Sequence, residues 1–247
     1  MRAVSLLSAL GPIDARSVSR DSFLKWVLLI PLVVLVLLRF GVPELSGWLE
    51  REHAFDLRPY YPLVASYLVV LFTPLLVGTV LGFLLLDERD DDTLTALLVT
   101  PVSLNGYLLY RLGVPIAVCL AANLAALPLT GLVELGWSRI VPIAAIAAVE
   151  APIVALFLAS VAQNKVQGFA WSKLVSGVQA LPLLAWFVEA PWQYAAGVVP
   201  GYWPAAAFWA ASAGDDASFA GFLAVGAAVH AAVLWALLRH FRTVMHR

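Results

Sequence analysis

The sequence predicts an all-α, multi-pass membrane protein with six transmembrane helices. Hydrophobic residues make up 62% of its 247 residues and charged residues only 13%, whereas about a quarter of the residues in a soluble domain are charged. The apolar residues form continuous runs of about 20 residues, the length that a helix needs to cross a bilayer. We expect a single transmembrane domain over residues 1–247, with spans at residues 23–42, 61–86, 105–132, 140–162, 168–188 and 219–238.

Basic residues indicate how these spans are oriented. Residues 1–22 combine Arg2, Arg16 and Arg20 with apolar side chains, which is typical of an amphipathic helix lying on the membrane surface; a frayed terminus is the alternative. About eleven of the fifteen Lys and Arg residues fall in the terminal segments, in residues 87–111 or near Lys165. Because Lys and Arg collect on the cytoplasmic side, we expect both termini to be cytoplasmic.

Residues 87–111, between the second and third predicted spans, begin with a dense acidic run. Three consecutive aspartates precede Thr93, and negative charge is favourable at a helix N-terminus. Thr100 precedes Pro101, which biases Thr100 away from helical geometry and ends the helix. The pattern predicts a short cytoplasmic helix over residues 91–100, one face of which carries three leucines: Leu94, Leu97 and Leu98. The alternative is a solvated connector, which would not need three aligned leucines.

Several classes of function lack their motifs. No GxxxxGK[ST] sequence occurs, so the chain has no phosphate loop with which to bind ATP. There is no HExxH sequence, and the four histidines are not spaced as metal ligands. No GxSxG elbow is present either. A formal net charge of -1 without a basic stripe argues against a nucleic-acid partner.

Three polar residues fall inside predicted spans. Glu150 lies near the centre of the fourth span, His230 at a comparable depth in the sixth and Asn123 in the third. Because polar groups are costly within a bilayer, they usually face a bundle interior or an aqueous cavity. We therefore treat these three as candidates for the substrate pathway, with a Glu150–His230 pair conceivable. The alternative for Glu150 is a structural carboxyl that holds helices together.

Residues 191–212 are rich in aromatic residues and proline. Such a segment suits the membrane–water interface as an aromatic belt. It is also compatible with an outer gate or a re-entrant hairpin, because Pro191, Pro200 and Pro204 prevent one continuous helix. The gate residues that we single out are Pro200, Tyr202 and Trp203.

Four glycines of the chain are expected to let helices pack closely. Small residues allow the backbones of neighbouring membrane helices to approach each other. The residues concerned are Gly78, Gly82, Gly113 and Gly226.

The segment after the second span resembles that of the type-2 ABC exporter permeases. The resemblance consists of a long span, an acidic residue, a variable polar run, Thr-x-x-x-Leu-Leu-x-Thr-Pro and another span. The residues that carry it here are Glu88, Thr93, Leu97, Leu98, Thr100 and Pro101. The layout of the whole chain is also similar, including the PGYWPAAAFW segment at residues 200–209. The nearest likeness is to small bacterial drug-export permeases, including those proposed to export fluoroquinolones. One departure is that the run before Thr93 is almost wholly acidic here.

The resemblance implies a membrane subunit that works with other chains in a bacterial inner or plasma membrane. Two ABC ATPase subunits would bind ATP and Mg²⁺, while this chain would bind no cofactor itself. A second permease subunit, identical or paralogous, would complete a pathway for a hydrophobic or amphipathic compound. The residues expected to meet the ATPase are Glu88, Asp91, Asp92, Thr93, Leu94, Leu97, Leu98, Thr100 and Pro101.

Two other functions are weighed against this one. A proton-coupled secondary transporter could use Glu150 and His230, and it would be expected to contain internal repeats with broken helices in corresponding halves. An intramembrane enzyme or an assembly factor is the third hypothesis, and the sequence offers no recognisable nucleophile–base or metal set for an enzyme.

Overall fold

The helices of this protein run along one common direction. The structure, a computed structural model, describes residues 16, 19–20, 22–90 and 104–245. These parts contain helices, turns and short connections, without a strand. The predicted helix at 91–100 lies outside the described residues, as does most of the predicted interfacial helix at 1–22.

The first two long helical runs contain π-helical turns. Helix α2 (Ser22–Val36) continues through the π-helical segment η1 (Leu37–Gly41) into α3 (Val42–His53), so the helix is longer than the predicted span at 23–42. Pro43 lies in the first turn of α3, where its missing N–H is tolerated. The second run comprises η2 (Arg58–Tyr60), α4 (Tyr61–Ala65), η3 (Ser66–Leu71) and α5 (Phe72–Asp90).

The remaining long helices follow the predicted spans closely. They are α7 (Leu104–Thr130), the pair α8 (Trp137–Ala148) and α9 (Glu150–Val161), and α13 (Asp216–Met245). The break between α8 and α9 falls at Val149. Pro152 lacks the N–H that would bond to the carbonyl of Ala148, which explains a break there.

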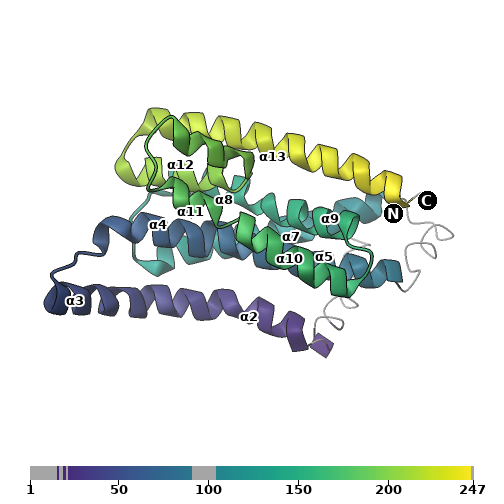
Figure 1. Ribbon diagram of the computed structural model, residues 1–247, viewed down its shortest axis with the longest axis horizontal. Helices are drawn as coiled ribbons and strands as arrows, with labels where there is room; N and C mark the ends of the chain where they lie inside the picture. Colours follow the sequence, from purple (N-terminus) through teal and green to yellow (C-terminus); the bar gives the residue numbers. More distant parts are fainter. Residues whose placement is uncertain (1–15, 17–18, 21, 91–103, 246–247) are drawn as a thin grey trace.

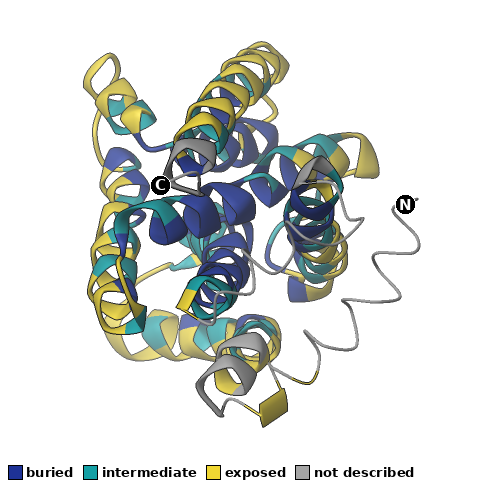
Figure 2. Cartoon of the chain, turned by 90° about the vertical axis from the view of Figure 1, so that its right-hand side faces the viewer, coloured by how far each residue is buried: buried dark blue, intermediate teal, exposed yellow. Residues whose placement is uncertain are grey.

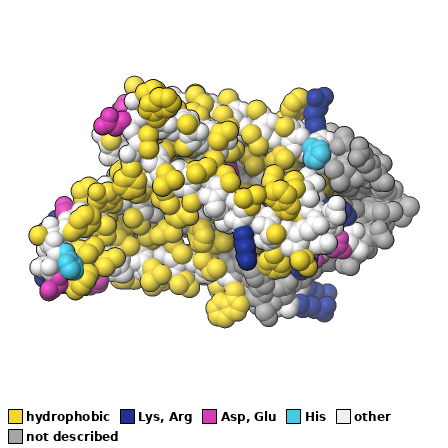
Figure 3. All heavy atoms as spheres, viewed as in Figure 1, with side chains coloured by type: hydrophobic (Ala, Val, Ile, Leu, Met, Phe, Trp, Pro, Cys, Tyr) yellow, Lys and Arg dark blue, Asp and Glu magenta, His cyan; other side chains and the backbone are white. Residues whose placement is uncertain are grey.

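Within the described part of the chain, five helical runs are long and apolar enough to cross a membrane. They are Leu29–His53, Arg58–Asp90, Gly106–Thr130, Trp137–Val161 and Asp216–Phe241. Hydrophobic side chains cover the middle of the face in Figure 3, and charged ones gather mostly toward its two ends. The structure therefore has the character of a multi-pass membrane protein.

The predicted fifth span at 168–188 is not one continuous helix. Helix α10 (Lys165–Val178) stops at Gln179, and the short helix α11 (Leu181–Ala185) follows. The reason is Pro182: it cannot donate to the carbonyl of Val178, so that carbonyl loses its helical partner. The chain continues through the 3-10 helix η4 (Trp192–Val198) into α12 (Tyr202–Ala213).

The helix ends define two ends of the molecule. The start of α2, the end of α5, the starts of α7 and α10 and the end of α13 lie together on the right in Figure 1. We call this the Asp90 end. The turn between α12 and α13 lies at the opposite end, which we call the Ala213 end.

Helix α5 is the centre of the bundle. Most of its span is buried, whereas the spans of α2–α3 and α13 are largely exposed, and Figure 2 shows buried residues gathered at the centre. It packs along α9 through Gly78 and Gly82. A Cβ atom at Gly78 would lie 2.5 Å from the carbonyl oxygen of Ala151, and one at Gly82 would lie 2.9 Å from Leu158. Gly226 is similarly close to Trp203, but a Cβ at Gly113 would meet nothing within 4 Å, so Gly113 was wrongly expected to allow close packing.

We expect Gly78→Ala to destabilise the protein by about 1–3 kcal/mol, because the added methyl group must push α5 and α9 apart. Gly113→Ala is the control, since it adds a methyl group to a helix without a clash and should leave stability unchanged or higher. Thermal unfolding of the purified protein in detergent measures both. An equal effect of the two substitutions would contradict the close approach at Gly78.

Candidate functional site

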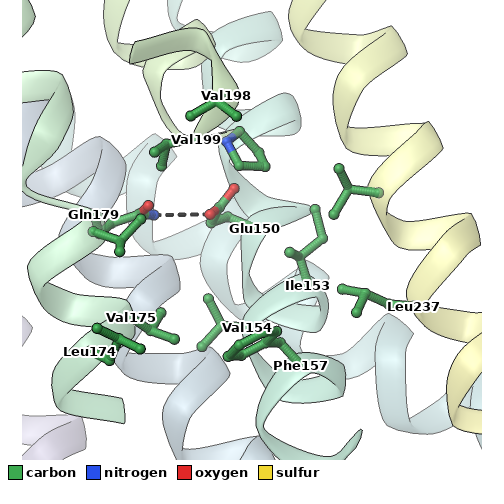
Figure 4. Close-up of a pocket in the computed structure, with 13 residues that line it drawn as sticks. Glu150, Ile153, Val154, Phe157, Leu174, Val175, Gln179, Val198, Val199 and Leu237 are labelled. Carbon is green, nitrogen blue, oxygen red and sulfur yellow. Dashed lines mark hydrogen bonds between the residues drawn. The ribbon is translucent and has the colours of Figure 1, made fainter. Parts of the chain in front are cut away.

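A groove of about 420 Å³ lies between α9, α10 and α13. In Figure 4, α10 stands on one side and α13 on the other, α9 lies between them, and Val198 and Val199 lie above Glu150. Its walls are almost entirely aliphatic or aromatic, and Glu150 and Gln179 are the polar residues that line it. The groove is thus an apolar channel with one polar patch.

Glu150 is held by contacts from two other elements. It is the first residue of α9 and is 4% exposed. The side-chain amide of Gln179 donates to Oε1 of Glu150 at 3.0 Å. Nε2 of His230, on α13, lies 3.0 Å from Oε2 of Glu150; this is ion-pair distance, without the alignment of a good hydrogen bond. The Glu150–His230 pair considered from the sequence is therefore formed.

The His230 ring is fixed from its other side. Nδ1 of His230 lies 2.8 Å from the carbonyl oxygen of Gly226. Because a carbonyl can only accept, this contact requires a proton on Nδ1 and directs Nε2 toward Glu150. Nε2 is therefore the ring atom that faces the Glu150 carboxyl group.

Gln179 is the member of this site that sequence reasoning missed. It caps the broken end of α10, and the backbone of Gly201 lies against its side chain. A Cβ at Gly201 would be 2.9 Å from Nε2 of Gln179. Pro182 was the feature of the sequence that could have revealed Gln179, because this proline ends α10 and leaves Gln179 at the break. The connection between η4 and α12 therefore lies beside Gln179, the hydrogen-bond partner of Glu150.

The other predicted pathway residues lie elsewhere. Asn123 is fully buried, and its amide atoms have no hydrogen-bond partner within the described residues; it does not line the groove. Pro200 does line the groove. Tyr202 is buried and lines a different cavity, while Trp203 donates through Nε1 to the carbonyl of Gly197 at 3.0 Å.

A second polar cluster lies at the Asp90 end. Glu88 forms an ion pair with Arg111 of α7 and accepts a hydrogen bond from the hydroxyl of Tyr107. Arg111 is only 4% exposed. Glu88, which the sequence assigns to the ATPase contact, is thus paired within the chain. The other predicted contact residues, Asp91, Asp92, Thr93, Leu94, Leu97, Leu98, Thr100 and Pro101, lie outside the described residues.

The neighbours of Glu88 tie α5 to two further helices. Arg89 donates to the carbonyls of Ala159 and Ala162, at 3.1 and 2.8 Å, and so occupies the C-terminus of α9. Nζ of Lys165, the first residue of α10, lies 3.0 Å from Oδ2 of Asp87. Three consecutive residues at the end of α5 therefore hold α7, α9 and α10. We call Asp87, Glu88 and Arg89 the α5 clamp.

No group of His, Cys, Asp and Glu side chains in the described ranges is arranged to hold a metal ion.

Long apolar helices around an apolar groove with one buried acid–base pair define a multi-pass membrane transport protein. The family model described as "Fluoroquinolones export permease protein Rv2686c-like" matches residues 14–238. This chain belongs to that family. It is similar to fluoroquinolones export permease proteins from two strains of Mycobacterium tuberculosis, each 35% identical over 250 residues that cover 98% of both chains. No solved structure matches it. The resemblance to bacterial drug-export permeases is thereby confirmed.

We expect Glu88→Gln to destabilise the protein by about 3 kcal/mol or more, because it removes the carboxylate from the ion pair with the buried Arg111 side chain. The double variant Glu88→Gln/Arg111→Gln should lose less, since it removes the buried positive charge together with the carboxylate. The control is Asp87→Asn, whose partly exposed pair with Lys165 should contribute at most about 1 kcal/mol. Thermal unfolding in detergent gives the ranking, and a smaller loss for Glu88→Gln than for Asp87→Asn would contradict it.

Proposed function

We propose that this chain is the membrane-spanning subunit of an ATP-driven exporter and that its substrate moves through the groove beside Glu150. The observation that carries the proposal is the groove itself, with apolar walls and one polar patch. Its volume of about 420 Å³ falls within the usual range of about 300–1,000 Å³ for small-molecule sites. The phosphate loop that ATP binding needs is absent from the sequence, so ATP and Mg²⁺ would be bound by two separate ATPase subunits.

The substrate class follows from the chemistry of the groove and from the names of the relatives. We propose a hydrophobic or amphipathic compound, such as a fluoroquinolone, which joins an aromatic ring system to a basic amine and a carboxylate. The ring system would lie against the apolar walls formed by residues such as Val154 and Phe157. A protonated amine would replace His230 as the partner of Glu150, so that the buried carboxylate keeps a positive partner.

Coupling would pass through the α5 clamp. Arg89 holds the end of α9 and Asp87 holds the start of α10. At their other ends the same two helices are joined by the hydrogen bond between Glu150 and Gln179. A push on residues 91–103, which connect α5 to α7, would therefore move both walls of the groove together. Switching between inward-open and outward-open states by such helix shifts is a recurrent transport mechanism.

The remaining assignments of the proposal follow from this arrangement. The Asp90 end would face the cytoplasm, together with both termini, as the distribution of Lys and Arg indicates. A second permease subunit, identical or paralogous, would complete the pathway in the bacterial cell membrane. The acidic run at residues 90–92 would pair with a basic rim on the ATPase.

The ATPase contact is tested by Leu94→Glu/Leu97→Glu/Leu98→Glu, which should abolish co-purification of the ATPase because it places three charges on the apolar face. The control is Val166→Glu, an exposed apolar residue at the same end of the molecule. An acidic residue in the first turn of α10 is well tolerated, and the ATPase should still bind. An ATPase that stays bound to the triple variant would refute the contact.

The substrate pathway is tested by Glu150→Gln, which should reduce export of a basic-amine substrate by about tenfold or more, since the loss of one charge contact of about 1.4 kcal/mol is a factor of ten. The amide retains a hydrogen-bonding group for Gln179, so folding should be preserved. Glu189→Gln is the control, because Glu189 is exposed and does not line the groove. The measurement is ATP-dependent drug uptake into inverted vesicles; normal export by Glu150→Gln would remove Glu150 from the pathway.

A proton-coupled transporter is the second candidate, and the Glu150–His230 contact favours it. Such a pair can take up and release a proton within the membrane. The two functions differ in their energy source. Drug transport driven by an imposed pH gradient in the absence of ATP would favour the second candidate, whereas strict dependence on ATP would exclude it.

A further inference from the structure

A second cavity, of about 360 Å³, lies at the Ala213 end. Residues from η4, α12 and α13 line it, together with Trp186 beyond the end of α11. The stretch from η4 to α12 separates it from the groove beside Glu150: Val198, Val199 and Pro200 line the groove, whereas Tyr194 and Tyr202 line this cavity. The two cavities are thus neighbours along the length of the molecule.

The walls of this cavity are five aromatic rings, each in contact with the next. Trp186 meets Trp209 with ring centroids 5.1 Å apart and planes at 80°. Tyr202 meets Trp209 at 6.3 Å and Phe222 at 6.5 Å, again nearly perpendicular. Tyr194 lies 6.3 Å from Phe222. Rings in this edge-to-face arrangement stabilise one another, and aromatic rings attract a cation that lies over a face.

One wall residue carries a negative charge. Asp215 lines the cavity, and Lys and Arg are absent from its described lining. Hydrogen bonds from the side chain and backbone of Ser218 hold the pKa of Asp215 below its usual range, so the carboxylate is ionised at neutral pH. The nearby Arg139 pairs with Asp216, at 2.7 Å, and also donates to the carbonyl of Ala211. The Asp215 charge is thus available to a ligand.

A buried hydroxyl of the cavity wall has no partner. The side chain of Tyr202 is 0% exposed, and its hydroxyl makes no hydrogen bond within the described residues. An unsatisfied buried polar group is unfavourable. A polar group on a ligand would satisfy this hydroxyl.

We propose that this cavity binds an organic cation: a protonated or quaternary amine on a compact apolar body. The aromatic faces attract a positive charge, Asp215 neutralises it, and the space suits a small ligand. The cavity's binding chemistry is independent of the proposed export function. The export function is needed only for one further step, in which a cation that leaves the groove enters this cavity at the outer end of the molecule.

The test uses two ligands of the same shape and different charge, benzyltrimethylammonium and its uncharged carbon isostere, neopentylbenzene. Both are titrated against the full-length protein in lipid nanodiscs without ATP, with the intrinsic tryptophan fluorescence as readout because Trp186 and Trp209 are in the wall. The cation should bind in a saturable manner, and the isostere should bind at least about tenfold more weakly.

Two charge-removing variants locate the site. Asp215→Asn should weaken binding of the cation about tenfold, while the asparagine can still accept the backbone N–H of Ser218 and cap α13. Glu134→Gln is the control, because it removes one negative charge from an exposed side chain that does not line the cavity and leaves the pair of Arg139 and Asp216 intact. Trp186→Leu should also weaken binding, since it removes one aromatic wall.

Three results would overturn the proposal. The first is the absence of saturable binding of the cation to the wild-type protein, and the second is equal loss of binding in Asp215→Asn and Glu134→Gln. Equal affinity for the cation and the isostere would also overturn it, because the site would then be only an apolar cavity. None of these measurements involves an ATPase, so their failure is distinct from a failure of the proposed export function.

Discussion

The burial of the Glu150 carboxyl is the constraint on which much of this structure depends. A carboxyl group inside an apolar helix bundle must find hydrogen-bonding partners, since no bulk water is there to supply them. Gln179 and His230 supply them from α10 and α13. The position of Gln179 in turn requires that α10 end at Val178, and Gly201 must lack a side chain beside it. The helix break at Pro182 and the close backbone approach at Gly201 thus both place Gln179 beside one buried acid.

The α5 clamp and the Glu150 contact together form a closed frame. Helices α9 and α10 leave the Asp90 end side by side, fixed there to α5 by Arg89 and by Asp87. They are joined again by the hydrogen bond between Glu150 and Gln179. Polar contacts therefore close both ends of the frame, and they link the two helices to each other and to the end of α5. The glycines Gly78 and Gly82 add a tight packing surface along the same side of α5.

The sequence was sufficient for features that depend on a single run of residues. Long apolar runs predicted an all-helical chain with several helices long enough to cross a membrane, and the isolated polar residues of those runs pointed to Glu150 and His230 as a pair. The break in the predicted fifth span was not foreseen, because the prediction followed its apolar composition and did not consider that Pro182 leaves the carbonyl of Val178 without a helical partner. Gln179 was missed for the same reason, since its role appears only when α10 is seen to end beside Glu150.

Features that depend on which helices are neighbours could not be predicted. The acidic run around Glu88 indicated a surface for another protein, but a charge pattern does not reveal that Arg111 and Tyr107 lie across from it. Likewise, a glycine in a span indicates close packing only where a neighbouring helix faces it, as at Gly78 and not at Gly113. The aromatic residues of the segment 191–212 were interpreted as an interfacial belt, although three of them line one cavity together with Trp186 and Phe222.

The two cavities share one chemical character, which bears on what the chain can transport. Each has apolar side chains and one carboxyl group in its lining, Glu150 in the groove and Asp215 in the aromatic cavity. They differ in how the carboxyl group is held: Glu150 is buried and already paired with His230, whereas Asp215 is exposed and ionised. In the proposed exporter, a cation that left the groove would return Glu150 to His230. It would then meet a carboxylate that is hydrated and binds it less tightly than a buried charge would. If the Ala213 end is the outer end, as the proposed function requires, this order of a buried and then an exposed carboxyl group would favour release in the direction of export.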